Sequence, residues 1–94
     1  MLARFFCVIL LGLIVVPQIA IAQDFDSYSC QQLWWERNAI YKDRGYCFRT
    51  DRAIRAFGNA GCQYDDVESV PLSHTERRII GDIQAWERRK SCPR

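Results

Sequence analysis

Four of the five cysteines, all those outside the apolar N-terminal run, could either bind a metal or form two disulfides. Cys30, Cys47, Cys62 and Cys92 are spaced 17, 15 and 30 residues apart. Structural zinc sites usually take cysteines from close pairs such as C-x-x-C, and these spacings contain no such pair. An even number of cysteines in a short exported chain is typical of a disulfide framework. The sequence therefore predicts two disulfides and no metal site, and nothing in it points to a cofactor.

Side chains that could catalyse a reaction are few and scattered. His74 is the only histidine, and neither a free cysteine nor a Ser-His-acid pattern accompanies it. Asp65, Asp66 and Glu68 form the densest acidic cluster, but they lack the alternation and the turn glycine of a calcium loop. A glycosidase pair of carboxylates is defined by its spatial separation, which the sequence leaves open. We therefore expect a non-catalytic protein, with a small secreted hydrolase as the alternative.

Aromatic side chains are the more promising binding groups. On a helix, Trp35 lies about 160° from Leu33 and beside Lys42, on a charged face. An exposed tryptophan can hold a sugar ring or anchor a partner protein. Tyr64, next to the acidic cluster, is a second candidate. The expected partners are cell-wall glycan or an exported protein, whereas 13 Lys and Arg against 11 Asp and Glu argue against a nucleic-acid-binding face.

Residues 1–22 have the pattern of a signal peptide. One positive charge precedes a run of twelve apolar residues at 5–16, and Ala20-Ile21-Ala22 has the small-x-small form that signal peptidases cut. As a helix the run would span about 18 Å, well short of a hydrocarbon core of roughly 30 Å, so no stable membrane anchor is expected. Cleavage would remove Cys7 and leave 23–94 as a single domain in the periplasm or outside the cell.

Capping residues predict three helices in this domain. A capping box of Ser29 with Gln32 begins the first, and one of Ser73 with Glu76 begins the last. The predicted helices cover 30–44, ended by Gly45; 51–57, begun by Thr50 and ended by Gly58; and 74–89. Segment 59–71 contains glycine turns and no helical period, so it is predicted as a loop pinned by Cys62. Segment 23–28 is expected to be a short polar and aromatic lead-in that is loose at its start.

The aliphatic core predicted for this chain is small. Ile, Leu, Val and Phe make up 12 of the 72 residues from 23 to 94, a low fraction for an ordinary globular core. Aromatic side chains and disulfides must therefore supply much of the stability. Trp34 and Trp86 are expected in the core, and Ala53, Ile54 and Phe57 are expected to share one face of the short helix.

Antiparallel packing of the two longer helices selects one of the three possible disulfide pairings. It brings Cys30, at the start of the first helix, to Cys92, after the last, and leaves Cys47 with Cys62 at the other end. In the same register, residues in contact have numbers that sum to about 122, which pairs Arg37 with Glu87 and Arg44 with Glu76. Alternatively, the guanidinium groups of both arginines reach solvent, and their aliphatic stems cover a narrow core. The predicted fold is all-α: a small disulfide-stapled three-helix domain with two longer antiparallel helices, a short helix and a pinned loop.

Residues 33–48 resemble the YARHG domain of bacterial secreted and envelope proteins. The matching motif residues are Leu33, Trp34, Arg37, Asn38, Ile40, Tyr41, Gly45, Tyr46 and Phe48. Lys42, Asp43 and Arg44 stand where the family name has Ala, Arg and His, which argues against histidine chemistry. The resemblance covers nearly all of 23–94 and implies an extracellular domain of about that size, without supplying a reaction. We therefore expect an exported YARHG-like domain that is a non-catalytic binding module in the periplasm or cell envelope; the alternatives are the hydrolase and an inhibitor or accessory subunit of another exported protein.

Overall fold

The computed structural model describes residues 24–94, so the predicted signal peptide lies outside the described residues. Three α-helices follow one another in the chain: α1 Cys30–Asp43, α2 Asp51–Phe57 and α3 His74–Arg89. Two short 3-10 turns precede α1 and α3, namely η2 Phe25–Ser27 and η3 Val67–Ser69. Within 24–94 there is no strand, and the one isolated β-bridge joins Tyr46 and Tyr64. The predicted all-α fold is confirmed.

The helices begin where their capping residues predict. The Ser29 hydroxyl accepts a hydrogen bond from the Gln32 amide at 3.1 Å, and the Gln32 side chain accepts one from the Ser29 amide at 2.8 Å. Ser73 and Glu76 form the same reciprocal pair at 3.0 and 2.8 Å. The Thr50 hydroxyl accepts from the Ala53 amide at 3.2 Å. Each cap satisfies amide groups that the first turn of a helix leaves without a partner.

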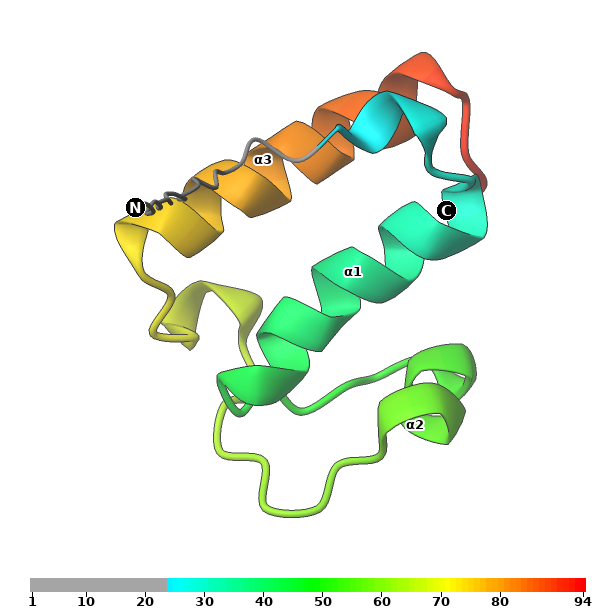
Figure 1. Ribbon diagram of the computed structural model, residues 1–94. Coiled ribbons are helices and arrows are strands. Elements are labelled where there is room, and N and C mark those ends of the chain that lie inside the picture. The colour runs from blue at the N-terminus through cyan, green and yellow to red at the C-terminus, as the bar shows by residue number, and fades with distance from the viewer. Residues whose placement is uncertain (1–23) are drawn as a thin grey trace, which may run out of the picture.

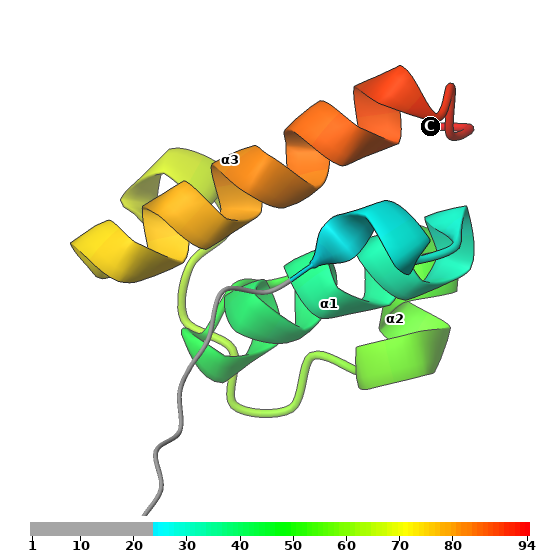
Figure 2. The same ribbon diagram turned by 45° about the horizontal axis from the view of Figure 1, so that its top comes forward.

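Helix α1 lies between the other two helices, with α3 antiparallel to it on one side and α2 on the other (Figures 1 and 2). Both predicted disulfides are present and hold this arrangement at opposite ends of α1. Cys30 is joined to Cys92, with their Cα atoms 5.5 Å apart, and Cys47 is joined to Cys62, with theirs 5.1 Å apart. Such bonds are typical of proteins in oxidising compartments. None of the helices described is both long and apolar enough to span a membrane.

The core between α1 and α3 contains a residue that the sequence analysis placed outside it. Leu33 and Ile83 are fully buried, and Phe25 joins them at 4% exposure. Phe25 belongs to the segment predicted as a lead-in, but η2 folds its ring onto the helix pair. The Lys90 ammonium fixes η2 from α3 by donating to the carbonyls of Asp26 at 2.6 Å and Tyr28 at 2.8 Å. With so few aliphatic residues available, the core includes the nearest aromatic ring.

The side of α1 that faces α2 is built from aromatic rings. Trp34 packs here, with its ring centroid 6.0 Å from that of Phe57, so this half-buried residue belongs to an aromatic cluster and not to the core around Leu33, where it was expected. Trp86 does pack against the core, as predicted. Phe57 also stacks on the buried Phe48 at 5.4 Å. The Arg52 guanidinium covers the Trp34 ring at 3.7 Å, a cation–π arrangement that ties α2 to α1.

One apolar residue of α2 faces solvent. Ala53 is buried, but Ile54 remains 40% exposed. The short helix packs against a single neighbour, α1, so only a narrow stripe of its surface is covered. Ile54 lies beyond the edge of that stripe.

The connection from α2 to α3 is more ordered than a simple loop. Cys47 donates its amide to the Tyr64 carbonyl at 2.8 Å, and the Gly45 carbonyl accepts from the amides of Gln63 and Tyr64 at 2.7 and 3.0 Å. The Asn59 side chain bonds both the amide and the carbonyl of Phe48, at 2.7 and 2.9 Å. These bonds, together with the Cys47–Cys62 disulfide, fix a segment that carries no helical signal.

Candidate functional site

Trp35 is exposed, as its position on α1 predicts, but α2 supports it from behind. Its side chain is 45% accessible, the largest fraction among the exposed large hydrophobic residues described. Its ring centroid lies 4.5 Å from that of Phe57 and 6.5 Å from that of Trp34. These contacts restrict the rotation of the indole while leaving part of it open to solvent. Trp35 is therefore a held aromatic platform rather than a free side chain.

A shallow groove lies directly beside this platform. Its volume is about 350 Å³. Its walls come from the first turns of α1 and the residue that precedes them, and it is lined by Tyr28, Gln31, Gln32, Trp35 and Glu36. Gln31 and Trp35 are four residues apart, so they are neighbours on the helix surface. The groove combines two aromatic rings with two amides and one carboxylate. We call it the Trp35 groove.

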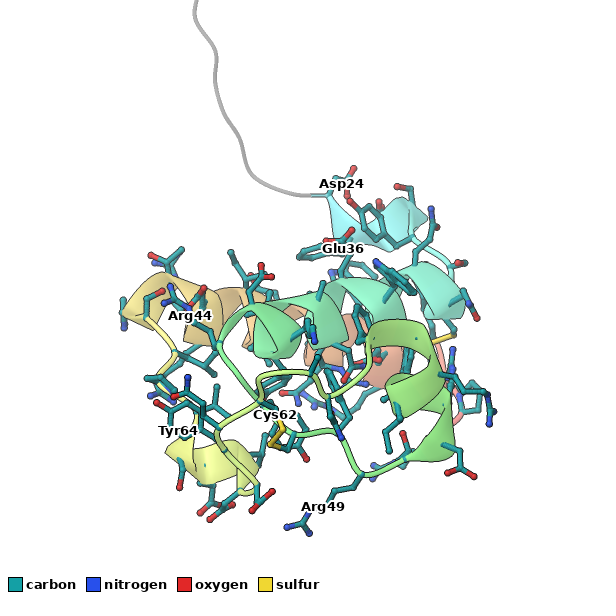
Figure 3. All side chains as sticks on the ribbon, turned by 90° about the horizontal axis from the view of Figure 1, so that it is seen from below. Asp24, Glu36, Arg44, Arg49, Cys62 and Tyr64 are labelled. Carbon is teal, nitrogen blue, oxygen red and sulfur yellow. A yellow bond between two sulfur atoms is a disulfide. The ribbon has the colours of Figure 1, made fainter. Side chains whose placement is uncertain are left out.

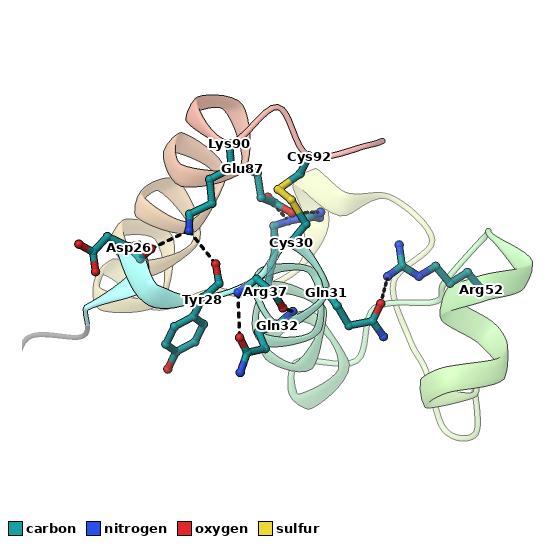
Figure 4. Close-up of a disulfide and its surroundings, with 11 residues drawn as sticks. Asp26, Tyr28, Cys30, Gln31, Gln32, Arg37, Arg52, Glu87, Lys90 and Cys92 are labelled. Carbon is teal, nitrogen blue, oxygen red and sulfur yellow. Dashed lines mark hydrogen bonds and ion pairs between the residues drawn. A yellow bond between two sulfur atoms is a disulfide. The ribbon is translucent and has the colours of Figure 1, made fainter.

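The two glutamines in the Trp35 groove are held in place by hydrogen bonds. The Gln32 side-chain oxygen accepts from the Ser29 amide in the capping box, and the Gln31 side-chain oxygen accepts from Nη2 of Arg52 at 3.1 Å. Figure 4 shows Arg52 reaching from α2 to Gln31 on α1. Because both oxygens are engaged, each glutamine presents its NH₂ group as a donor. Glu36 adds an acceptor, so the groove offers both kinds of polar partner.

Tyr64, the second predicted binding residue, lies elsewhere. Its ring packs over Gly45, where an added Cβ atom would meet Tyr64 ring carbons at 3.4 Å. Gly45 has φ +89°, a conformation that glycine adopts without strain. Figure 3 shows Tyr64 on the loop next to Cys62, well apart from Glu36 of the Trp35 groove. It lines a different groove of about 350 Å³, so the structure does not bring the two candidates into one site.

The residues weighed for catalysis or metal binding are not gathered into a site. His74 is the exposed first residue of α3. Asp65, Asp66 and Glu68 are exposed on the loop, where Asp66 caps η3 by accepting from the Glu68 amide at 3.2 Å. Within residues 24–94, no group of three or more His, Cys, Asp or Glu side chains is placed to hold a metal ion.

Both predicted arginine–glutamate pairs are present between α1 and α3. Arg37 meets Glu87 at 2.8 Å, with side chains 24% and 15% exposed, and Arg44 meets Glu76 at 2.9 Å in a more open position. The Ser73 amide and the Arg44 guanidinium, both donating to Glu76, lower the pKa of that carboxyl below its usual value. The arginines are therefore paired, although neither is fully removed from solvent.

The motif residues hold the domain together. Leu33 is buried, Arg37 pairs with Glu87, and Phe48 anchors the linker after α1. Asn38, only 7% exposed, donates its side-chain amide to the Trp34 carbonyl at 2.9 Å. Ile40 is half-buried on α1.

The tyrosines at the end of the motif form a ring pair. Tyr41 and Tyr46 have ring centroids 5.6 Å apart, and Tyr46 also meets Phe48 edge-on at 5.2 Å. Burial raises the pKa of the Tyr41 hydroxyl. The motif therefore specifies the α1 packing and the turn that follows it, while the Trp35 groove uses residues outside the motif.

Two signals could have pointed to the groove from the sequence. Gln31 precedes Trp35 by one helical turn, and Tyr28 stands just before the Ser29 cap. The contribution of Phe57 and Arg52 carries no such signal, because both come from α2 and reach α1 only in the folded chain.

The fold and these grooves define a small all-α, disulfide-linked domain with an exposed aromatic surface. A family model described as the YARHG domain matches residues 12–88, and the chain belongs to this family. The match begins within the predicted leader and ends before Cys92. No curated protein and no solved structure matches the chain.

Proposed function

We propose that this protein is a non-catalytic binding module of the periplasm or cell envelope that holds a sugar ring of the cell-wall glycan against Trp35. The observation that carries the proposal is the Trp35 groove, in which an exposed indole fixed by Phe57 stands beside Tyr28. Aromatic rings with a few placed polar groups are the usual lining of small-ligand sites. The apolar face of a sugar would lie on the indole.

The polar groups of the Trp35 groove suit a neutral sugar. Sugar hydroxyls both donate and accept hydrogen bonds, and the groove offers the amide donors of Gln31 and Gln32 beside the Glu36 carboxylate. No lysine or arginine lines this groove, so an anionic sugar would meet Glu36 without a compensating cation. A neutral, hydroxyl-rich ring is therefore the favoured ligand.

A sedimentation assay with purified cell-wall sacculi tests the proposal. The disulfide-bonded protein should pellet with the sacculi, and Trp35→Ala should weaken binding at least about tenfold, because a central aromatic anchor is commonly worth more than 1.4 kcal/mol. The matched control is Ile54→Ala, another exposed hydrophobic residue, on α2 and outside the groove. Trp35→Ala should cost about 1 kcal/mol of folding stability, because its ring contacts are lost while much of its surface is already exposed.

Three outcomes would overturn the proposal. Equal binding by the Trp35→Ala variant and the unchanged protein would show that the indole is not the anchor. Release of soluble sugar fragments from the sacculi on long incubation would show a hydrolase instead. A parallel capture from periplasmic extract identifies a protein partner; a partner bound through Trp35, with no binding to sacculi, would replace the glycan by an exported protein.

A further inference from the structure

A further groove lies between α1 and the C-terminal end of α3. Its volume is about 780 Å³. Trp34 and Arg37 line it from α1, Gln84, Glu87 and Arg88 line it from α3, and residues 91–94 form its edge. None of these residues lines the Trp35 groove. We call it the Arg37 groove, and its chemistry differs from that of the first.

Arg37 is oriented in the wall of this groove before any ligand arrives. Its Nε donates to Oε1 of Glu87 at 2.8 Å and its Nη2 donates to Oε2 at 3.0 Å (Figure 4). A guanidinium has five N–H donors in a rigid fork, and this pairing uses two of them. Among residues 24–94, nothing accepts a hydrogen bond from Nη1 of Arg37. A nitrogen with two donors therefore remains available, on a side chain that the Glu87 carboxylate already holds.

The charge of the Arg37 groove is positive. Arg88 and Arg94 are exposed and line it, and neither forms an ion pair with a described residue. Glu87 is the one carboxylate side chain in the lining, and Arg37 neutralises it. Arginine suits carboxylate recognition because its fork matches the two oxygens. The groove therefore favours a ligand that carries carboxylates.

The edge of the groove favours a peptide over other anions. Residues 92–94 leave the helical path and line the groove as irregular backbone, so their carbonyls are not engaged in a helix. A peptide laid alongside can donate main-chain N–H groups to such carbonyls, as in strand addition. Trp34 and Pro93 add apolar surface for its side chains. A phosphate polymer would use the arginines alone.

From these observations we propose that the Arg37 groove binds an extended acidic peptide segment of a partner protein. The pre-oriented Arg37 and the exposed Arg88 hold carboxylates, while the segment after α3 pairs with the peptide backbone. The proposal does not depend on glycan binding, because it uses a separate set of side chains.

Fluorescence anisotropy with a labelled hexaglutamate peptide tests it on the disulfide-bonded protein. Hexaglutamate should bind, and Arg88→Gln should weaken binding about tenfold, since an Arg–carboxylate contact is lost. The matched control is Arg78→Gln, an exposed arginine on the same helix that does not line the groove. Trp35→Ala should leave hexaglutamate binding unchanged. Circular dichroism verifies that each variant is folded, and substitution of an exposed arginine should leave the fold intact.

Three outcomes would overturn the inference. The assignment of the peptide to the Arg37 groove is wrong if Arg78→Gln weakens binding as much as Arg88→Gln, because the effect would then reflect the total charge of the protein. The acidic requirement is wrong if hexaglutamine binds as well as hexaglutamate. The inference that the ligand is a peptide is wrong if polyphosphate of matched charge competes with hexaglutamate at equal or lower concentration, because the groove would then be a general anion site.

Discussion

Helix α1 packs against its two neighbours by different means. On the α3 side, aliphatic residues and Phe25 are buried, two arginine–glutamate pairs cross the interface, and the Cys30–Cys92 bond closes one end. On the α2 side, Trp34, Trp35, Phe48 and Phe57 pack through their rings. The Cys47–Cys62 bond lies on that side of the domain.

The difference shows how a small chain can combine a closed, buried interface with an open aromatic one. The α3 side covers most of its apolar groups and contains the fully buried side chains Leu33 and Ile83. The α2 side leaves Trp35 and Ile54 partly open, and α2 has only seven residues, too few to form a stable helix alone. We expect the α3 side to determine global stability and the α2 side to shape the Trp35 groove.

Removal of a disulfide should give the largest loss of folding stability, and it should show which side of α1 contributes more to that stability. Replacing Cys30 and Cys92 by serine removes a cross-link between residues 62 positions apart and should lower the free energy of unfolding by about 4 kcal/mol. The Cys47–Cys62 cross-link joins residues 15 positions apart, and its removal should cost about 3 kcal/mol. Urea denaturation of the two double variants measures both values. The ranking of the two sides would be reversed if the Cys47–Cys62 variant proved the less stable.

Truncation of one ring on the α2 side should act locally. Ile83→Ala removes a fully buried side chain and should cost about 3 kcal/mol across the whole domain. Phe57→Ala should cost less, about 2 kcal/mol, since Phe57 is only half-buried. In the Phe57→Ala variant, hydrogen exchange should be fast only in α2, while the amides of α1 and α3 stay protected. Loss of protection throughout the chain in Phe57→Ala would mean that the two sides are one cooperative unit.

The two ion pairs on the α3 side should contribute unequally to folding stability. Arg37→Ala should cost about 2 kcal/mol, because it leaves the mostly buried Glu87 without its partner. Arg44→Ala should cost under about 1 kcal/mol, because Arg44 is 43% exposed. Thermal denaturation measures both, and the double variant Arg37→Met with Glu87→Leu should recover much of the loss. Equal costs for the two arginine variants would contradict this ordering.

The smallest expected effect is the pH dependence of the cap at the start of α3. Because the pKa of Glu76 is lowered in the folded protein, its carboxylate stabilises the fold above about pH 4.3, the usual glutamate value. That stabilisation is lost as the pH falls through the folded pKa. Glu76→Gln should therefore melt at a lower temperature than the unchanged protein near neutral pH, and the gap should close as the pH falls below the usual glutamate range. A gap that stays constant with pH would show that the charge contributes nothing.

Much of this fold could be predicted from particular residues. Ser29, Thr50 and Ser73 locate the helix starts, because a cap acts over three or four residues and needs nothing distant. The order of the helices then set the disulfide pairing and the arginine–glutamate register, since an antiparallel pair leaves few alternatives. The exposure of Trp35 followed from its helical angle.

Only the tertiary structure decided which neighbour each side of α1 would meet. A helical angle separates Trp34 from Leu33 but does not reveal that Trp34 packs on α2. The same holds for Phe25, which joins the core only because η2 folds back onto α1 and α3, and for Tyr64, which the Gly45 turn keeps away from Trp35. The Trp35 groove is lined by residues 28–36 alone, but its indole is held by Phe57 of α2, and the Arg37 groove lies where α1 meets the end of α3. Sequence patterns report local hydrogen bonds and the direction of a side chain, whereas a groove requires the relative positions of whole elements.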